Sequence, residues 1–343
     1  MEKIEPYSPS EYNGMIRLDA NESCFDLPKE IKAEIADKIK SVEFNRYPDP
    51  YASELCDKFA AYFNIDSENV VAANGSDEIL SILFGAVLDY KSTVLLASPD
   101  FSMYRFYADL YGQNTVIYNK PIMTQSDCSD LFSKAKNVDL TLFSNPCNPT
   151  SEGIDAKDIL NALSETDGII VADEAYMDFW GESIIDKIYT NKNLIVLKTC
   201  SKAFGLAAAR VGFAVADKKI IEMFKKAKSP YNVSSLDQAA ASVVLSHPEY
   251  LKKRTAQIIS ARNKLYNGLK PLLTSEMRMS EPKANFVCIH TARAVHIYEK
   301  LRKYNIAVRC PEKNILRISA GTENETETLL TTFGKVVKEC DRQ

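Results

Sequence analysis

The amino-acid sequence predicts an α/β fold, with a mostly parallel β-sheet in its larger part and a smaller α+β part at the C-terminal end. Continuous apolar stretches, typical of strands buried on both faces, occur at residues 70–73, 93–97, 139–143, 168–172, 193–197 and 211–215. Helical segments separate several of them, as the crossover connections of a parallel sheet require. The length of 343 residues fits two domains, since one domain has about 150 residues.

An arm and two helices precede the first strand. Residues 1–27 contain turn-forming residues without a sustained period, which predicts an extended arm. Residues 28–39 and 52–63 carry apolar residues at helical spacing. The prolines of residues 45–50 predict a loop between these two helices.

A strand, a turn and a helix follow at residues 70–88. Gly75, Ser76 and Asp77 lie in the turn that leads to a helix predicted over residues 79–88. A helix start presents free backbone N–H groups and a positive dipole end, which together bind anions. The same residue types also form an ordinary helix cap, so the turn alone leaves a phosphate site and a structural cap as alternatives.

The C-terminal part begins after a break at residues 230–234. A long helical stretch, residues 235–269, links the two domains, and short strands are predicted at residues 284–290, 307–309 and 316–319. We therefore divide the chain into a large domain (residues 28–240), a small domain (241–343) and an arm (1–27) that packs with the small domain or a partner subunit.

Composition and charge argue against several classes of function. The net charge of −4, without a basic cluster interleaved with aromatic residues, argues against a nucleic-acid partner. No apolar run approaches the roughly 18 residues of a membrane span and no signal peptide opens the chain, so we expect a cytoplasmic protein with no membrane partner. The eight cysteines form no Cys-x-x-Cys pair and only three histidines are present, which predicts reduced thiols and no metal site.

Residues 197–213 combine a lysine and an arginine with small apolar residues. Lys202 is preceded by Ser201 and followed eight positions later by Arg210. A lysine in an apolar pocket is pushed toward the free amine, which forms Schiff bases with aldehydes. Pyridoxal 5'-phosphate supplies an aldehyde and a phosphate, and Ser201 and Arg210 are suitable ligands for the phosphate. A strand-end lysine with a buried stem and a helix-capping arginine explain this segment about equally well.

Further polar motifs follow other predicted strands. Asn148 lies in the motif Asn-Pro-Cys-Asn-Pro-Thr, and Asp173 and Tyr176 lie in the motif Asp-Glu-Ala-Tyr. Phe101 follows an earlier strand. Because ligands of such sheets bind at the carboxyl ends of the strands, these motifs and Lys202 are expected at one edge of the sheet.

In this order, the motifs resemble those of the fold-type I pyridoxal-phosphate enzymes, and within them those of the histidinol-phosphate aminotransferases. Matching stretches occur at residues 6–7, 19–22, 45–49, 75–78, 145–150, 173–176, 201–206, 230–234, 284–287, 308–309 and 316–319. The resemblance implies a mixed, mostly parallel seven-stranded sheet in the large domain, pyridoxal 5'-phosphate as cofactor, and a homodimer with shared active sites.

The resemblance also implies roles for individual residues. Lys202 would bind the cofactor as an aldimine and move a proton between substrate and cofactor, while Asp173 would keep the pyridine nitrogen protonated. The other implied cofactor contacts are Phe101 on the ring face, Asn148 and Tyr176 at the phenolic oxygen, Gly75, Ser76, Asp77, Ser201 and Arg210 at the phosphate, and Tyr47, which would reach the phosphate in the neighbouring subunit.

Four residues match substrate-binding positions of the resembled family: Tyr7, Asn21, Arg309 and Arg317. The implied ping-pong reaction converts L-histidinol phosphate and 2-oxoglutarate to imidazole-acetol phosphate and L-glutamate. A guanidinium group can bind a carboxylate or a phosphate through two hydrogen bonds, so Arg317 would serve both substrates. Surface ion pairs are the alternative explanation of the two arginines.

The sequence departs from the resembled pattern at four places. Asp19 stands where Asn is frequent, Cys147 replaces Asn, and Ala208 replaces Gly. Residues 150–153 interrupt the usual Pro-Thr-Gly turn close to Asn148, a change that can shift this loop.

Three alternative functions share many of these motifs. A phospho-amino-acid decarboxylase of cobalamin biosynthesis, acting on threonine phosphate or serine phosphate, differs mainly in holding a substrate carboxylate perpendicular to the cofactor ring. An aromatic or broad-specificity aminotransferase is the second alternative. The third is a non-catalytic domain of a regulator, against which the intact Lys202 and Asp173 argue.

Overall fold

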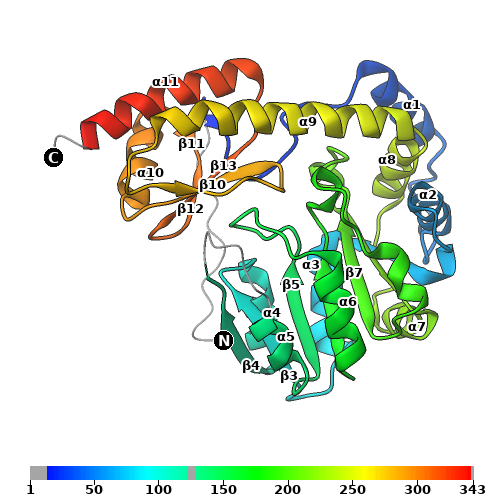
Figure 1. Ribbon diagram of the computed structural model, residues 1–343. Helices are drawn as coiled ribbons and strands as arrows, with labels where there is room; N and C mark the ends of the chain where they lie inside the picture. The colour runs from blue at the N-terminus through cyan, green and yellow to red at the C-terminus, as the bar shows by residue number, and fades with distance from the viewer. Residues whose placement is uncertain (1–13, 122–128, 341–343) are drawn as a thin grey trace.

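The computed structural model describes residues 14–121 and 129–340 and contains three sheets (Figure 1). The strands are β1 (Ile16–Arg17), β2 (Val70–Asn74), β3 (Thr93–Ser98), β4 (Asn114–Asn119), β5 (Leu140–Ser144), β6 (Ile169–Asp173), β7 (Leu194–Thr199), β8 (Val211–Ala216), β9 (Arg278–Met279), β10 (Phe286–His290), β11 (Ile306–Ala307), β12 (Arg309–Glu312) and β13 (Ile315–Ser319). The α-helices are α1 (Lys29–Lys40), α2 (Ser53–Phe63), α3 (Gly75–Ile82), α4 (Ser102–Leu110), α5 (Ser129–Ala135), α6 (Ala156–Glu165), α7 (Lys218–Ala227), α8 (Ser235–Leu245), α9 (Pro248–Leu269), α10 (Ala294–Lys303) and α11 (Glu323–Cys340). Short 3-10 helices are η1 (Ser67–Asn69), η3 (Met177–Phe179), η4 (Ile185–Tyr189), η5 (Ala207–Ala209) and η6 (Lys270–Leu272), and η2 (Leu83–Val87) is a π-helix.

The large sheet has seven strands in the order β2-β8-β7-β6-β5-β3-β4. Its neighbouring strands are parallel except where β8 pairs with β2 and with β7. The predicted fold class, with a mostly parallel, mixed seven-stranded sheet and a smaller domain, is confirmed. The register sets Asp173 opposite Ser144 on one side and Leu197 on the other, so β5, β6 and β7 end at one edge.

Two layers of helices cover the large sheet. Residues of β6 and β7 alternate between two apolar clusters, as the two-residue period of a strand requires. One cluster packs the sheet against α2, α5, α6 and α8, and the other packs it against α3, α4 and α7. Because both faces are buried, the strands are apolar throughout, which is the pattern that predicted them.

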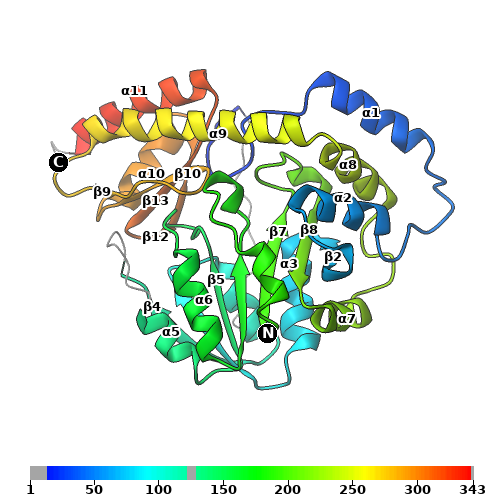
Figure 2. The same ribbon diagram turned by 45° about the vertical axis from the view of Figure 1, so that its right-hand side comes forward.

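The smaller sheet is antiparallel and has the order β12-β13-β10-β9. Helix α9 runs past both the large sheet and the small sheet (Figures 1 and 2). The C-terminal half of α9 packs with α10, α11 and the small sheet in a third apolar cluster. The arm joins this part through β1, which pairs in parallel with β11, and through the buried Leu18. The domain limits stay a prediction.

Four elements differ from the sequence-based prediction. Helix α3 begins at Gly75, so the residues predicted as a turn form its first turn. The negative charges of Asp77 and Glu78 interact favourably there with the positive end of the helix dipole. The predicted helix at residues 235–269 divides into α8 and α9, because Pro248 disfavours the helical conformation of the residue before it, His247.

The other two differences concern strands. The strand predicted at residues 307–309 divides between β11 and β12, which pair in different sheets. Strand β4 was not predicted, because as an edge strand it pairs only with β3 and leaves Val116 and Ile117 partly exposed.

Candidate active site

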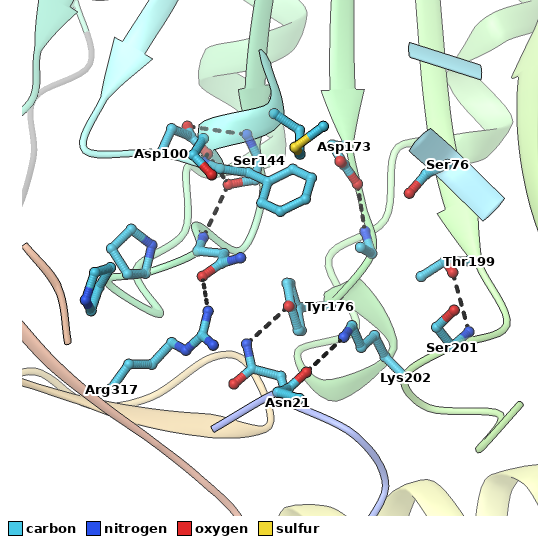
Figure 3. A pocket seen from close by; sticks show the side chains of 18 of the residues that line it. Asn21, Ser76, Asp100, Ser144, Asp173, Tyr176, Thr199, Ser201, Lys202 and Arg317 are labelled. Atoms are coloured by element: carbon cyan, nitrogen blue, oxygen red, sulfur yellow. Dashed lines mark hydrogen bonds between the residues drawn. The ribbon is translucent and has the colours of Figure 1, made fainter. Parts of the chain in front are cut away.

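A cavity of ≈ 670 Å³ lies between the carboxyl edge of the large sheet and strands β12 and β13 (Figure 3). Its volume is typical of a site for a cofactor-sized ligand. The residues predicted from the sequence that line it are Asn21, Ser76, Asp77, Phe101, Asn148, Asp173, Tyr176, Ser201, Lys202, Arg210, Arg309 and Arg317. The structure therefore brings most of the predicted site residues together.

Lys202 lies just beyond β7 and points into this cavity (Figure 3). Its Nζ donates a hydrogen bond to the carbonyl oxygen of Ala20 at 3.0 Å and lies 5.8 Å from the centre of the Tyr176 ring. Among the described residues, no ion pair with a carboxylate is found for this amine. The lysine is thus held by a neutral acceptor and faces open space, an arrangement that suits a nucleophile.

Asp173 ends β6 and is 4 % exposed. Its Oδ2 accepts a hydrogen bond from the hydroxyl of Tyr104 at 2.7 Å, and its Oδ1 accepts one from the backbone N–H of Ala175 at 3.1 Å. Burial raises the pKa of Asp173 to about 6, although these two hydrogen bonds favour the ionised form. A cationic ring nitrogen beside this carboxylate would offset the cost of its burial.

The first turn of α3 and Arg210 form a cradle for an anion. The guanidinium of Arg210 donates to Ser201 Oγ and to Asp77 Oδ2, both at 3.3 Å. Gly75 has φ +77°, a backbone conformation that residues with a side chain rarely adopt, so this position favours glycine. The free N–H groups of the helix start, the hydroxyls of Ser76 and Ser201 and this guanidinium are a donor set that fits a phosphate.

Arg317 of β13 occupies the opposite end of the cavity and is 9 % exposed. Its Nη1 donates to Asn148 Oδ1 at 2.6 Å and its Nη2 donates to the carbonyl oxygen of Asp19. The Nε atom has no hydrogen-bond partner among the described residues. Burial lowers the pKa of Arg317, and the nearby charge of Arg309 lowers it further. This buried cation is therefore held by neutral oxygens and can accept an anionic ligand.

The arm closes one side of the cavity through Asn21. Its Nδ2 donates to the hydroxyl of Tyr176 at 2.9 Å, while its Oδ1 accepts from Ser319 Oγ at 3.0 Å. Asn21 is buried and has φ +53°, a conformation that asparagine tolerates better than most residues. The contacts fix the arm between Tyr176, which follows β6, and Ser319 of β13.

Of the predicted site residues that the structure describes, Gly75 and Tyr47 do not line this cavity. Tyr47 is 80 % exposed and stacks on Tyr231, with ring centres 4.5 Å apart. Tyr7 lies outside the described residues. The altered turn beside Asn148 is well anchored, since Ser151 Oγ accepts from the backbone N–H groups of Lys283 at 3.1 Å and Ala284 at 2.8 Å.

The sequence did not predict a polar network that binds the backbone of Asn148. Asp100 accepts a hydrogen bond from Ser144 Oγ (Figure 3). Asp100 also accepts one from Lys120 Nζ at 2.9 Å, and Ser144 Oγ accepts one from the backbone N–H of Asn148 at 3.0 Å. Burial alone would lower the pKa of Lys120, but the charge of Asp100 raises it above the ordinary value. Asp100 and Ser144 each lie at or just after the end of a strand, which is the signal that identified Asp173.

The described residues contain no group of three or more histidine, cysteine or acidic side chains arranged to bind a metal ion. Within residues 14–121 and 129–340, no helix has the length and apolar character needed to span a bilayer. The donor set of the cavity combines an amine, a buried carboxylate and an anion cradle. It fits pyridoxal 5'-phosphate, which carries an aldehyde, a ring nitrogen and a phosphate.

Comparisons with known proteins agree with this geometry. The family model described as aminotransferase class I and II matches residues 13–333. The histidinol-phosphate aminotransferase of Clostridium kluyveri is 37% identical over 344 residues, which cover 98% of this chain and 97% of that protein.

Two solved structures have the same fold. The histidinol-phosphate aminotransferase from Sinorhizobium meliloti in complex with pyridoxal-5'-phosphate has a TM-score of 0.86 at 22% identity, covering 95% of this chain and 91% of that one. The L-threonine-O-3-phosphate decarboxylase from Porphyromonas gingivalis has a TM-score of 0.81 at 19% identity, covering 94% of this chain and 100% of that one. Similarities at these identities show the fold alone.

The burial of Asp173 predicts a pH-dependent stability of the cofactor-free protein. Below about pH 4 the carboxyl of residue 173 is protonated in both the folded and the unfolded state. Between pH 4 and pH 6 this carboxyl ionises in the unfolded state but stays protonated in the folded state. Ionisation then stabilises the unfolded state, so the free energy of unfolding falls as the pH rises. Above pH 6, Asp173→Asn should therefore raise the free energy of unfolding by about 3 kcal/mol, a gain that disappears near pH 4.

Urea denaturation of both proteins between pH 4 and about pH 8 measures this difference. Asp57→Asn, which removes an exposed carboxylate, is the matched control and should show no such trend. A constant difference between Asp173→Asn and the unaltered protein across this range would contradict the account.

Proposed function

Because the chain belongs to the aminotransferase class I and II family, we propose that it is a pyridoxal 5'-phosphate-dependent histidinol-phosphate aminotransferase. It would convert L-histidinol phosphate and 2-oxoglutarate to imidazole-acetol phosphate and L-glutamate, a step of histidine biosynthesis. The choice of substrates is supported by the Clostridium kluyveri relative, which is 37% identical over nearly the whole chain.

One feature of the cavity favours a phosphorylated substrate. The register of β12 and β13 sets Arg309 directly opposite Arg317. Like charges at directly opposed positions of two strands destabilise a sheet, and the described residues place no carboxylate in an ion pair with Arg317. A phosphate dianion between the two guanidinium groups relieves this repulsion more fully than a single carboxylate, and Arg317 can still bind the carboxylate of glutamate.

In this proposal, the residues of the cavity act on the bound cofactor and on the reacting carbon of the substrate. The cofactor, when bound, supplies an aldehyde and a ring that stabilises negative charge on the substrate carbon. Lys202 Nζ takes the proton from that carbon and returns it during transfer of the amino group. Asp173 would keep the ring nitrogen protonated, while Asn148 and Tyr176 would donate hydrogen bonds to the phenolic oxygen.

Binding of the substrate would also change the hydrogen bonds of Arg317. Its Nη1 is engaged by Asn148 and its Nη2 by the carbonyl oxygen of Asp19. A phosphate or carboxylate at this end would replace at least one of these neutral acceptors with a charged one, which makes a stronger hydrogen bond. The arm that carries Asp19 and Asn21 would therefore respond to the substrate and help to exclude water.

A phospho-amino-acid decarboxylase keeps the same fold, so the fold does not discriminate between the two reactions. The relative with substantial sequence identity favours the aminotransferase. A cytoplasmic location is part of the proposal and is supported by the buried free thiols of Cys56, Cys147, Cys200 and Cys288, which suit a reducing compartment.

We also propose a homodimer, in which Tyr47 reaches the cofactor phosphate of the other subunit. Large exposed side chains gather near Tyr47, namely Phe44, Tyr51 and Tyr231. Exposed apolar side chains that cluster in this way are typical of protein interfaces. The proposal also gives a role to Tyr47, which in the single chain contacts only Tyr231 among the aromatic residues described.

The proposed reaction can be tested by half-reactions of the purified holoenzyme, followed by the absorbance of the bound cofactor. L-histidinol phosphate and L-glutamate, added separately, should each convert the cofactor to its amine form, and Lys202→Ala should abolish both conversions. Release of carbon dioxide from L-threonine phosphate, without conversion by histidinol phosphate, would replace the aminotransferase by the decarboxylase.

The two arginines should differ in their effect on the two substrates. Arg309→Gln should raise the KM for histidinol phosphate by about 10-fold to 100-fold, the loss expected for a hydrogen bond to a charged group, and should change the KM for glutamate much less. Arg302→Gln removes an exposed charge of the small domain and serves as the control. Equal effects of Arg309→Gln on both substrates would argue against phosphate binding by this residue.

Complementation between two inactive variants tests the shared site. Tyr47→Ala and Lys202→Ala subunits, mixed in equal amounts and allowed to exchange, should regain about a quarter of the wild-type activity, since half of the dimers are mixed and each has one intact site. Activity no higher than that of the separate variants would show that Tyr47 does not serve the other subunit.

A further inference from the structure

Tyr104 contacts two residues of the proposed cofactor site, Asp173 and Phe101. It belongs to α4, is 1 % exposed and lines the same cavity. Its hydroxyl donates to Asp173 Oδ2 at 2.7 Å, across 69 positions of the sequence. Its ring meets Phe101 edge to face, with ring centres 5.5 Å apart and an angle of 84° between the rings.

Burial and two nearby carboxylates destabilise the ionised form of Asp173. The carboxylate is buried, and Asp100 at the start of the β3–α4 connection and Asp77 of α3 are further negative charges in its vicinity. Lys198 of β7 and Lys202 are the positive groups on the neighbouring segments, but the amine of Lys198 is engaged by Glu174 at 3.1 Å. Hydrogen-bond donors must therefore stabilise the ionised form of Asp173.

The structure supplies two such donors, one for each carboxylate oxygen. The backbone N–H of Ala175 serves Oδ1, and the hydroxyl of Tyr104 serves Oδ2. Donors on both oxygens fix the plane of the carboxylate as well as its charge. The Tyr104 hydroxyl itself stays protonated, because burial and the charge of Asp173 raise its pKa well above the ordinary value.

We propose that Tyr104 is a positioning residue that holds the Asp173 carboxylate ionised and oriented toward the ring nitrogen of the bound cofactor. The inference rests on the proposed function, because it assumes that Asp173 faces this nitrogen. Through its contact with Phe101, the same side chain also fixes the residue expected against the ring face. Tyr104 would thus link the nitrogen contact and the ring-stacking contact.

The test measures the affinity of the apoprotein for pyridoxal 5'-phosphate as a function of pH, without any turnover. In the unaltered protein the affinity should fall as the pH drops through about 6, where Asp173 gains a proton. In Tyr104→Phe this midpoint should move upward by about one pH unit, the effect of losing one hydrogen bond to a charged group.

Three comparisons make the result specific. Tyr111→Phe removes a hydroxyl with an equally short hydrogen bond, 2.7 Å to Ser81, outside the cavity, and should leave the midpoint unchanged. In an Asp173→Asn background, Tyr104→Phe should have no effect on the pH dependence. Incorporation of 3-fluorotyrosine at position 104, a stronger donor of the same shape, should move the midpoint downward.

An unchanged midpoint in Tyr104→Phe, or a shift that persists in the Asp173→Asn background, would overturn the proposal. If Tyr104→Phe does not fold, the fluorinated protein decides alone, since an unchanged or raised midpoint would contradict the role of the hydroxyl. Failure of the unaltered protein to bind the cofactor would instead reject the proposed function, so the two failures are distinguishable.

Discussion

The parallel pairing of β5, β6 and β7 is the constraint on which the site depends. Their register sets Ser144, Asp173 and Leu197 at one level, so the segments after these strands emerge side by side. Asn148, Asp173 and Lys202 are distant in sequence and meet only because of this alignment. A slip of one residue in β6 would turn Asp173 to the opposite face of the sheet. The apolar residues that fix the register therefore also fix the geometry of the site.

Buried charges around the cavity are each held by specific partners. Lys198 pairs with Glu174, the residue that follows Asp173, and Lys120 pairs with Asp100, which is linked to Asn148 through Ser144. Such pairs add little net stability, because the cost of removing charges from water offsets their attraction. Their contribution is to fix the end of β6, which carries Asp173, and the loop that carries Asn148. Arg317 differs from Lys198 and Lys120, since its guanidinium is held by neutral oxygens and is available to an anion.

The sequence predicted what depends on local pattern and composition. Buried strands appear as apolar runs, and the motifs after them identified Lys202, Asp173 and Asn148, which the structure brings together. Contacts between distant segments were not visible in the sequence. Tyr104 reaches Asp173 across 69 positions, and Lys120 reaches Asp100 from an edge strand that was itself not predicted. The helix break before Pro248 was predictable in principle, because a proline disfavours the helical conformation of the residue that precedes it.

The central claim is that Lys202 is the residue that binds the cofactor covalently. Borohydride reduction of the holoenzyme, followed by proteolysis and mass spectrometry, fixes the cofactor on the lysine that holds it. The account predicts a phosphopyridoxyl group on Lys202 in nearly all molecules and none on the buried Lys120 or Lys198. A label on either of those two lysines, or scattered over exposed lysines with Lys202 unmodified, would contradict the assignment of the site.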